Sequence, residues 1–479
     1  GRRMILPPLR EYQVQAHRDT LRLLADLRLE GQPERVLNVA PCGAGKTRLG
    51  LEHVAEYTRD LRPALWIAPG KDLVRQPVER LLAEGWSDVA WISDGRRQGR
   101  EDARLTVATV QGLEALAASG RSLPEADLLV IDEARSCATP GRVALLDRWP
   151  GAVRIGYDAS PIGPGGVGLG MLFRRLLVVA QPGELIAAGY LAPYVVRAPK
   201  AHQPELAADP VVAWRNCTRA GGELTLVYCR DVAHAQEVAA AFLRAGVAAA
   251  CLTGKDSNPR RAEVLADLAR GRLQVVTSAI VLRQGIDVPA VSCIMVARAA
   301  LSLSLWVQMA GRGGRPKERC LVIDLHGAVH LHGHPADPRA WSLEGEAVRQ
   351  IEGLPPCRQC SACLAWWPGD GGACPAPDCG APLLAAPRAP VRVKATELVE
   401  VFAAQSGDEK AAALVRYTEA AYRSAVARGL KDKDLTRACQ SAAFKWAALY
   451  HDRPPFAEVA RIVRGLSMGA RQQTIRGVT

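Results

Sequence analysis

The sequence lacks the features that membrane, secreted and disulfide-rich proteins need. It contains no uncharged apolar run of about 18 residues, so we expect no segment to span a bilayer. Before Pro7 the only apolar stretch is Met4, Ile5 and Leu6, which is too short for a signal peptide. The 13 cysteines are odd in number, and without a signal peptide they indicate a reducing, cytoplasmic setting.

The chain is also poor in acidic residues relative to basic ones. Lys and Arg number 61 against 49 Asp and Glu, which gives a net charge of +12. An excess of this sign favours polyanionic partners, and we expect nucleic acid in preference to an anionic membrane. The excess is uneven, because residues 391–479 hold 15 Lys and Arg against 9 Asp and Glu.

Short apolar runs that alternate with helical stretches predict the fold class. A length of 479 residues suggests about three domains. The apolar runs are typical of buried parallel strands in an α/β sheet. The expected strands are Val36–Val39, Ala64–Ile67, Leu105–Ala108, Leu128–Ile131 and Val153–Ile155, then Leu224–Tyr228, Ala248–Leu252, Gln274–Val276, Cys293–Val296 and Cys320–Ile323. The repeat predicts two tandem parallel-sheet α/β domains, residues 4–195 and 196–345.

A glycine-rich turn follows the first expected strand and opens a helix. It reads Ala40-Pro41-Cys42-Gly43-Ala44-Gly45-Lys46-Thr47. Gly43 and Gly45 would let backbone N–H groups face an anion at a helix N-terminus. Lys46 would then reach the β- and γ-phosphates of a nucleotide, and Thr47 would ligate Mg²⁺. The match to the phosphate-binding loop is partial, because Ala40 stands where the full pattern has glycine.

Two acids end the expected strand Leu128–Ile131. Asp132 is placed to hold Mg²⁺, directly or through water, and Glu133 to polarise an attacking water. Each motif alone has a plain structural alternative, a tight turn or a solvated strand end. Both motifs at strand ends, in this order, indicate nucleotide hydrolysis.

Together these segments resemble superfamily 2 DEAD/DEAH-box helicases over roughly residues 5–345. The resembling segments are Leu9–Gln13 (adenine-reading element), Ala40–Thr47 (motif I), Ala68-Pro69 with Leu73 and Gln76 (motif Ia), Thr109–Gln111, Asp132–Arg135 (motif II), Gly285–Pro289 (motif V) and Gln308–Arg315 (motif VI). The resemblance implies two RecA-like domains that bind ATP and Mg²⁺. It also implies nucleotide contacts from Gln13, Gly285 and Asp287, and a catalytic part for Gln308.

The arginines of the last motif have a physical interpretation of their own. Arg312 and Arg315, supplied by the second domain, would neutralise charge that develops on the γ-phosphate, as arginine fingers do. Closure around ATP and release after hydrolysis would then become relative motion along a bound strand. The alternative for both residues is a basic loop that contacts nucleic acid.

Two positions depart from the family pattern. Arg135 stands where the family usually has Asp or His, and Asp158-Ala159-Ser160 replaces a Ser/Thr-Ala-Thr triplet. We expect ATPase activity to survive, because Lys46, Asp132 and Glu133 are intact. The departures bear on the coupling of hydrolysis to strand separation. We hypothesise that Arg135 and Asp158 pair with each other.

The choice of nucleic acid rests on weaker signals. Motif VI opens Trp306-Val307-Gln308, unlike the His-Arg opening of DEAD-box RNA helicases. Ala159-Ser160-Pro161 and Gly285–Pro289 look more like the DNA-acting branch. We therefore favour DNA over RNA, with contacts mainly to phosphates and little sequence preference.

Five cysteines cluster after the second domain, with spacing typical of a zinc ribbon at residues 353–388. Four thiolates in two short knuckles suit tetrahedral Zn²⁺ in a structural site. The preferred ligands are Cys360, Cys363, Cys374 and Cys379, with Cys357 as an alternate. Buried or disulfide-linked cysteines are the alternative.

Two further segments have open interpretations. His326, His330, His332 and His334 form either a second metal site or, as favoured, a structural segment similar to the one after motif VI in phage and prophage helicases with a zinc ribbon. Residues 391–479 are expected to form a helical, basic accessory domain. That domain would clamp a duplex, bind a replication or recombination protein, or serve as a solubilising surface.

The sequence thus predicts an ATP-driven motor that translocates on or unwinds DNA. Three alternatives stay open: an RNA helicase, a double-strand translocase that never separates strands, and a nucleic-acid-binding scaffold with weak ATPase activity.

Overall fold

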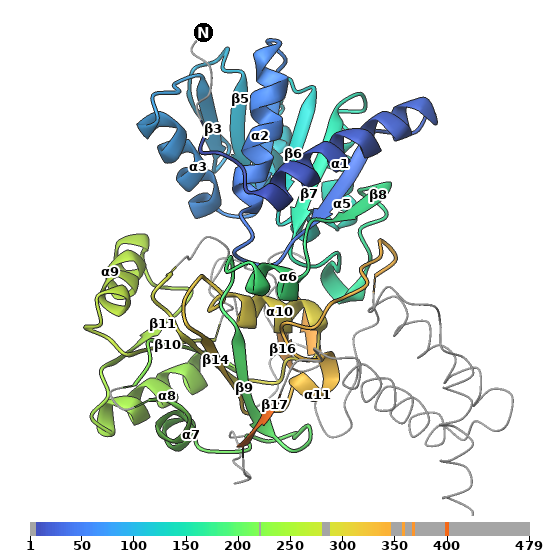
Figure 1. Ribbon diagram of the computed structural model, residues 1–479. Coiled ribbons are helices and arrows are strands. Elements are labelled where there is room, and N and C mark those ends of the chain that lie inside the picture. The colour runs from blue at the N-terminus through green and yellow to red at the C-terminus, as the bar shows by residue number, and fades with distance from the viewer. Residues whose placement is uncertain are drawn as a thin grey trace, which may run out of the picture. The chain divides into compact units, whose positions relative to one another are not determined.

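The computed structural model describes residues 6–219, 222–279, 288–345, 357–359, 366–368 and 398–401. Within these residues two sheets follow in tandem, each with helices on both faces (Figure 1). This arrangement confirms the predicted pair of α/β domains, here called lobe 1 and lobe 2. The described residues of both lobes fall in one compact unit, apart from 336–340. No helix among the described residues is long and apolar enough to cross a membrane.

Lobe 1 is an eight-stranded sheet in the order β4-β3-β5-β2-β6-β7-β1-β8, parallel except at β4. Its strands are β1 (Arg35–Val39), β2 (Ala64–Ala68), β3 (Val89–Ser93), β4 (Arg96–Gly99), β5 (Leu105–Thr109), β6 (Leu128–Asp132), β7 (Val153–Asp158) and β8 (Arg175–Val178). Its helices are α1 (Glu11–Leu29), α2 (Lys46–Arg59), α3 (Lys71–Ala83), α4 (Val110–Ala118), α5 (Pro140–Leu146) and α6 (Pro182–Ala187), with 3₁₀ turns at Ala134–Cys137 and Pro164–Gly166.

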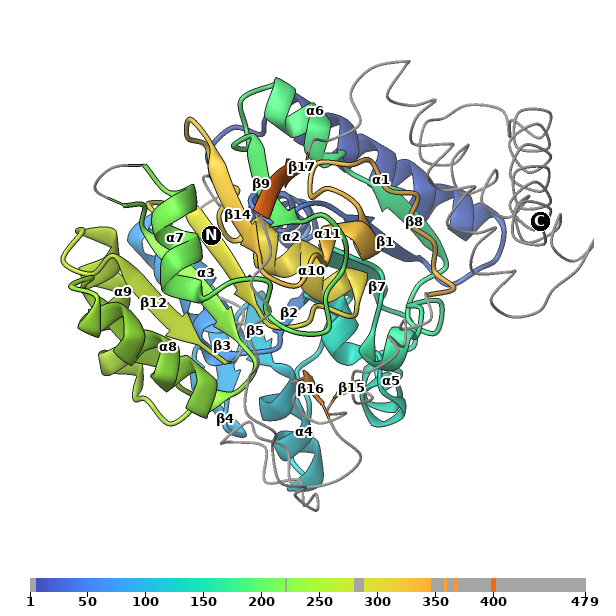
Figure 2. The ribbon, with the colours of Figure 1, turned by 90° about the horizontal axis from the view of Figure 1, so that it is seen from below.

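Lobe 2 is a seven-stranded sheet in the order β11-β12-β10-β13-β14-β9-β17. Its strands are β9 (Tyr194–Pro199), β10 (Thr225–Cys229), β11 (Ala249–Leu252), β12 (Val275–Ser278), β13 (Cys293–Ala297), β14 (Cys320–Asp324) and β17 (Leu398–Val401). Its helices are α7 (Pro210–Cys217), α8 (Val232–Arg244), α9 (Asn258–Ala269), α10 (Leu303–Gly311) and α11 (Val329–His332). Figure 2 shows α8 and α9 beside β12. A separate pair, β15 (Cys357–Gln359) and β16 (Trp366–Pro368), is antiparallel.

Consecutive residues of each central strand enter opposite cores, which explains why the strands are continuously apolar. In β2, Trp66 packs into the core under α1, α2 and α3, while Leu65 and Ile67 pack into the core under α4 and α5. Because side chains alternate between the faces of a sheet, a strand covered by helices on both faces must be apolar at every position. Lobe 2 repeats the arrangement with its own two cores.

The register of lobe 1 brings three functional segments to one edge of the sheet. β7 lies between β1 and β6, with Val39 opposite Asp158 and Asp132 opposite Tyr157. The chain leaves β1 toward the glycine-rich turn, so that turn, Asp132 and Asp158 lie together at the carboxyl ends of parallel strands. That edge is where open α/β sheets bind ligands.

The elements that the sequence did not predict lie mainly at the edges of the two sheets. β3, β4, β8 and β9 were not expected, and β9 occupies the region that was read as the join between domains. β17 pairs antiparallel with β9 although it lies in the segment 391–479 that was expected to be helical. The remainder of that segment, and most of the expected ribbon at 353–388, lies outside the described residues.

Two buried histidines should make lobe 2 sensitive to acid. Burial lowers the pKa of His234 and of His326 to about 4. Both values lie below the ordinary 6.5, so the unfolded chain binds more protons than the folded chain between pH 6.5 and 4, and stability falls as pH drops through this window. For His326 the loss is about 3 kcal/mol once the pH is below 4.

We expect His326→Gln to weaken this dependence, because an amide can donate to the carbonyl of Gln203, which lies 3.1 Å from Nδ1 of His326, without taking up a proton. Thermal unfolding of the full chain at pH 7 and at pH 5 measures the effect. Equal losses of stability in the variant and the parent would contradict it.

Candidate functional site

The glycine-rich turn has the backbone conformation that an anion site at a helix N-terminus requires. Gly43 and Gly45 have φ of 90° and 75°, in the left-handed region that favours glycine. α2 begins at Lys46, and Gly45, its N-cap residue, provides no side-chain cap. A β-carbon on Gly45 would lie 2.6 Å from Nε2 of Gln13. The first turn of α2 therefore presents its N–H groups at an uncapped end, which suits a phosphate group.

Lys46 lies over this turn. Its Nζ donates to the carbonyl oxygens of Ala40 at 3.1 Å and Pro41 at 3.4 Å. Both partners are neutral, so exchanging them for phosphate oxygens would give charge-assisted hydrogen bonds, which are stronger. The loop and its lysine therefore fit the phosphates of ATP, as the sequence predicts.

The start of α1 is anchored to the same turn. Gln13 Nε2 donates to the carbonyls of Ala44 at 3.1 Å and Gly45 at 3.3 Å, and the Tyr12 hydroxyl donates to that of Ala44 at 2.7 Å. Tyr12 also contacts Tyr190, whose ring lies 4.5 Å from the guanidinium carbon of Arg10. Sequence reasoning identified Gln13 but missed Tyr12 and Tyr190, because Tyr190 meets α1 only in the fold.

The pKa values of the two acids at the end of β6 are shifted in opposite directions. Burial, together with the neighbouring Glu133, raises the pKa of Asp132 to about 7, although Lys46 opposes the rise. Burial also acts to raise the pKa of Glu133, but Arg135, Lys46 and Arg312 lower it overall. Glu133 has a φ of 50°, a strained conformation for a residue with a side chain.

These groups also fit Mg²⁺. A buried carboxylate that resists ionisation gains from a nearby cation, and the donor set of Asp132 and the Thr47 hydroxyl is all oxygen, as Mg²⁺ prefers.

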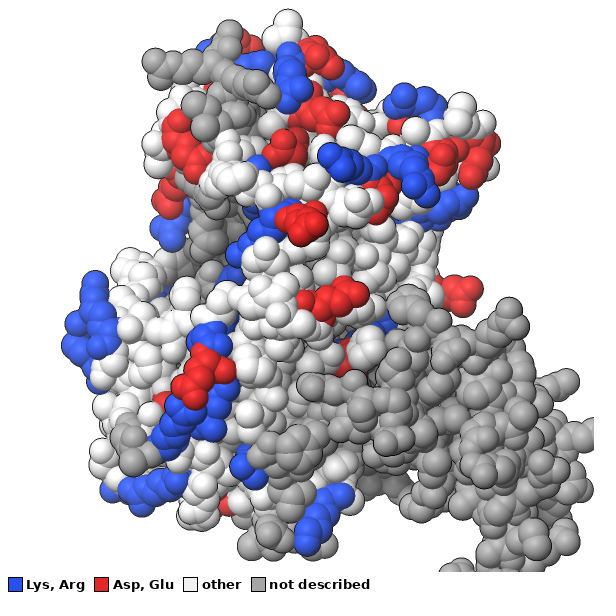
Figure 3. Space-filling model, in the orientation of Figure 1, with Lys and Arg blue, Asp and Glu red and all other residues white. Residues whose placement is uncertain are grey.

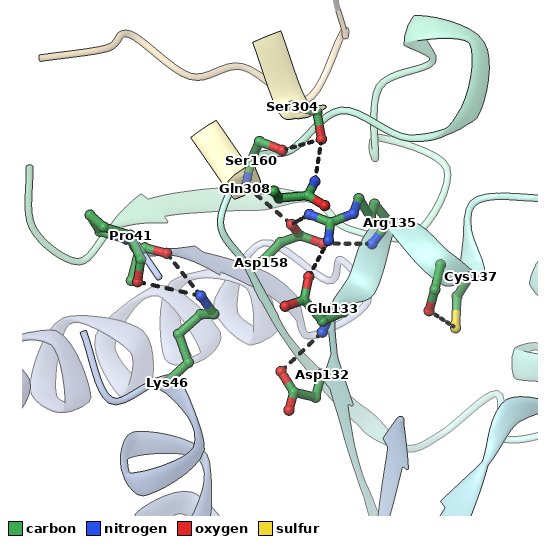
Figure 4. Close-up of polar contacts among 12 residues, drawn as sticks. Pro41, Lys46, Asp132, Glu133, Arg135, Cys137, Asp158, Ser160, Ser304 and Gln308 are labelled. Carbon is green, nitrogen blue, oxygen red and sulfur yellow. Dashed lines mark hydrogen bonds and ion pairs between the residues drawn. The ribbon is translucent and has the colours of Figure 1, made fainter. Parts of the chain in front are cut away.

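The predicted pair of Arg135 and Asp158 is present and buried. Arg135 Nη1 donates to Asp158 Oδ1 at 2.6 Å, and its backbone N–H donates to Oδ2 at 2.8 Å. The same guanidinium donates through Nη2 to Oε2 of Glu133. Asp158 is 0% exposed and the Arg135 side chain 6% exposed. Arg135 therefore sits between the expected catalytic glutamate and the end of β7 (Figure 4).

A chain of hydrogen bonds continues from this pair into lobe 2. The Ser160 N–H donates to Asp158 Oδ1 at 3.1 Å, and the Ser160 hydroxyl donates to that of Ser304 at 2.8 Å. Gln308 Nε2 donates to the same Ser304 oxygen at 2.8 Å. Glu133 is thus linked to Ser304 of α10 through Arg135, Asp158 and Ser160 (Figure 4). Sequence reasoning missed Ser304, although its position four residues before Gln308 places both on one helix face.

The segment after α10 lies against the glycine-rich turn. A β-carbon on Gly311 would lie 2.8 Å from Cβ of Cys42, and one on Gly43 would lie 3.4 Å from Nη1 of Arg315. Arg312 is close enough to Glu133 to lower its pKa, against the effect of burial. Both predicted arginines therefore come from lobe 2 to the nucleotide side of lobe 1.

Several other predicted site residues fall on parts of the chain that the structure does not describe. Gly285 and Asp287 lie outside the described residues, as do Cys360, Cys363, Cys374 and Cys379. Cys357 is described only as the first residue of β15. In the histidine-rich segment, ring nitrogens of His326, His330 and His332 contact three different carbonyl oxygens, which supports the structural interpretation.

Breaking the buried pair of Arg135 and Asp158 should lower the free energy of unfolding far more than breaking an exposed ion pair. Asp158→Asn would remove one of the two carboxylates that pair with the buried Arg135 and leave Glu133 as the other, and we expect a loss of about 3 kcal/mol in unfolding free energy. The matched control is Asp102→Asn, which breaks the exposed pair of Arg100 and Asp102 and should change little. Chemical denaturation measures both, and similar losses would refute the buried role.

Known proteins resemble this chain in sequence and in fold. The putative mitochondrial ATP-dependent helicase irc3 of Schizosaccharomyces pombe is 25% identical over 357 residues, or 67% of this chain and 58% of that protein. A 51.5 kDa protein of a Lactococcus phage is 28% identical over 31% of this chain and 34% of its own length. The chain thus spans between a third and three fifths of these relatives.

Among solved structures, a fragment of a putative HsdR subunit of a type I restriction enzyme from Vibrio vulnificus YJ016 has a TM-score of 0.53 at 18% identity. The matched region covers 72% of this chain and 68% of the fragment. At this identity the likeness shows the fold alone.

Two family models match in the order of the lobes. The model of the type III restriction enzyme res subunit matches residues 6–160, and the helicase conserved C-terminal domain matches residues 211–317. The first match contains the glycine-rich turn, Asp132, Glu133 and Asp158, and the second contains Gln308, Arg312 and Arg315. With two RecA-like lobes that meet at these residues, the chain belongs to superfamily 2 of the helicases.

Proposed function

We propose that this protein is an ATP-driven helicase or translocase that acts on nucleic acid, most specifically on DNA. The observation that carries the proposal is that Lys46, Asp132 and Glu133 of lobe 1 face a segment of lobe 2 that supplies Arg315 and Arg312. A phosphate site with basic residues from a second lobe suits hydrolysis that responds to lobe movement.

Each residue has a role that its surroundings support. Lys46 holds the β- and γ-phosphates, and Glu133 polarises the attacking water, because its lowered pKa keeps it ionised. Arg312 and Arg315 neutralise charge that develops on the γ-phosphate. Bound Mg²⁺ would supply positive charge to the phosphate oxygens, held by Asp132 and Thr47.

One observation favours DNA over RNA, which is that the first lobe matches the family model of a restriction enzyme. Residues 196–345 hold 18 Lys and Arg against 13 Asp and Glu, and basic side chains predominate where lobe 2 reaches the surface in Figure 3. This excess favours contacts to phosphates, which both nucleic acids offer. An RNA helicase, a double-strand translocase and a scaffold with weak ATPase activity are the alternatives.

Two further proposals concern residues outside the described part of the chain. A structural Zn²⁺ held by Cys360, Cys363, Cys374 and Cys379 remains proposed from spacing. A replication or recombination partner for the segment 391–479, of which the structure describes 398–401, remains proposed from its basic composition.

Lys46→Ala should abolish ATP hydrolysis that is stimulated by nucleic acid, because the phosphates lose their principal cation. The matched control is Arg59→Ala, which removes a basic side chain at the exposed end of the same helix. Measuring turnover with single-stranded DNA, duplex DNA and RNA, alongside strand displacement on tailed duplexes, separates the alternatives. Full biological activity of Lys46→Ala would favour the scaffold.

Ser304→Ala should weaken the link between hydrolysis and strand movement. The substitution removes the hydroxyl that Ser160 and Gln308 share, and a neutral hydrogen bond contributes about 1 kcal/mol, or roughly fivefold in rate. We expect fewer base pairs opened per ATP hydrolysed, with little change in KM for ATP. Ser160→Ala should act likewise, and the double variant should lose no more than either single one. Additive losses would exclude a shared pathway.

A further inference from the structure

Three potential metal ligands meet on the outer side of lobe 1, between α1 and α2. His17 comes from α1, and His53 and Glu56 come from α2. His17 Nε2 lies 3.2 Å from Glu56 Oε2, and the two imidazole rings are 4.5 Å apart between centroids. One ligand atom from each residue falls within 4.8 Å of the others. Among the described residues this is the one such group of three.

The buried member of the group lacks the hydrogen bonds that a buried imidazole normally makes. His53 is 0% exposed, and neither of its ring nitrogens has a partner among the described residues. His17 Nδ1 is also buried without a hydrogen-bond partner, and Glu56 Oε2 is buried with the contact to His17 Nε2 at 3.2 Å but no hydrogen bond. Buried polar atoms without partners are rare in folded proteins, and a bound water or metal ion would supply the missing partner. Burial, aided by His17, lowers the pKa of His53 and keeps the ring neutral, which is the form that binds metals.

We propose that His17, His53 and Glu56 form a binding site for a divalent transition metal of the zinc class. Two imidazole nitrogens and one carboxylate oxygen are a donor set that Zn²⁺ takes with a water in its fourth position. Imidazole disfavours Mg²⁺ and Ca²⁺, which prefer oxygen ligands. The side chains of His17 and Glu56 are 18% and 43% exposed, so the ion reaches the buried His53 from solvent on their side.

The metal would join the two helices that shape the phosphate turn. α1 carries Gln13, one turn before His17, and α2 begins at Lys46, two turns before His53. A bond from each helix to one ion would hold Gln13 against the turn. The site itself is independent of the proposed ATPase, because none of its ligands faces the nucleotide residues described above.

Cobalt binding to the metal-free full chain tests the site. Co²⁺ replaces Zn²⁺ and distinguishes ligands, because thiolate sites give a sulfur-to-metal charge-transfer band and nitrogen–oxygen sites do not. The cysteine cluster and this site are therefore separable in one titration without nucleotide. The variants are Glu56→Gln and His17→Gln, both at partly exposed positions, with circular dichroism to confirm folding.

We expect the parent to bind one more equivalent of Co²⁺ tightly than either variant does. The spectrum of that equivalent should lack the thiolate band. Each variant should bind the same equivalent at least tenfold more weakly. The matched control, Glu52→Gln, removes the same charge from the same helix one turn earlier and should bind as the parent does. Identical stoichiometry and spectra in the parent and Glu56→Gln would overturn the proposal and leave a buried water as the partner of His53.

Discussion

The ion pair of Arg135 and Asp158 joins the ends of β6 and β7 at the point on which the candidate site depends. The guanidinium of Arg135 also donates to Glu133, so Asp158 of the neighbouring strand acts on the expected catalytic glutamate through Arg135. The pair is possible only because the strand register places Asp158 next to the end of β1 and one strand away from Asp132. Backbone pairing therefore sets the electrostatics of the site.

The same edge of the sheet explains why the two lobes meet where they do. Ser160 follows β7 directly, and its hydroxyl reaches Ser304 on α10. The chain after α10 then passes Cys42 and Gly43 of the phosphate turn. Glycines make this approach feasible, because a β-carbon at Gly311 would lie 2.8 Å from Cβ of Cys42, and one at Gly43 would lie 3.4 Å from Nη1 of Arg315. The residues that are proposed to bind the nucleotide therefore lie next to the contacts between the two lobes.

The sequence predicted the central strands and the local motifs well, because both leave a signal in consecutive residues. Strands such as β6 are apolar up to the final Asp132, and the observed ends of the predicted strands differ from the predicted ones by at most three residues, the largest difference being at the end of β7. β4 was missed because Arg96–Gly99 is an exposed edge strand without apolar alternation. β9 was missed because it spans the predicted boundary between residues 195 and 196 and follows Pro193, although a proline before the first residue of a strand costs no ladder hydrogen bond.

The residues of the candidate site divide in the same way, into those that neighbouring residues in the sequence reveal and those that only the fold brings together. Lys46, Asp132 and Glu133 were found from adjacent residues, and the pairing of Arg135 with Asp158 was found because two departures from one pattern had opposite charges. Tyr190, Ser304 and the group of His17, His53 and Glu56 were not found. Their contacts join elements far apart in the chain, and a single sequence does not contain the packing that brings them together.

The buried pair also limits how this sequence can change over evolutionary time. Restoring the common acid at position 135 alone would add a carboxylate beside Glu133 and Asp158 and remove the guanidinium that pairs with both. Restoring the common hydroxyl at position 158 alone would leave that buried guanidinium with Glu133 as its remaining carboxylate partner. Each intermediate is penalised, so the two positions are expected to drift as a linked pair. Descendants should therefore keep both residues or exchange both.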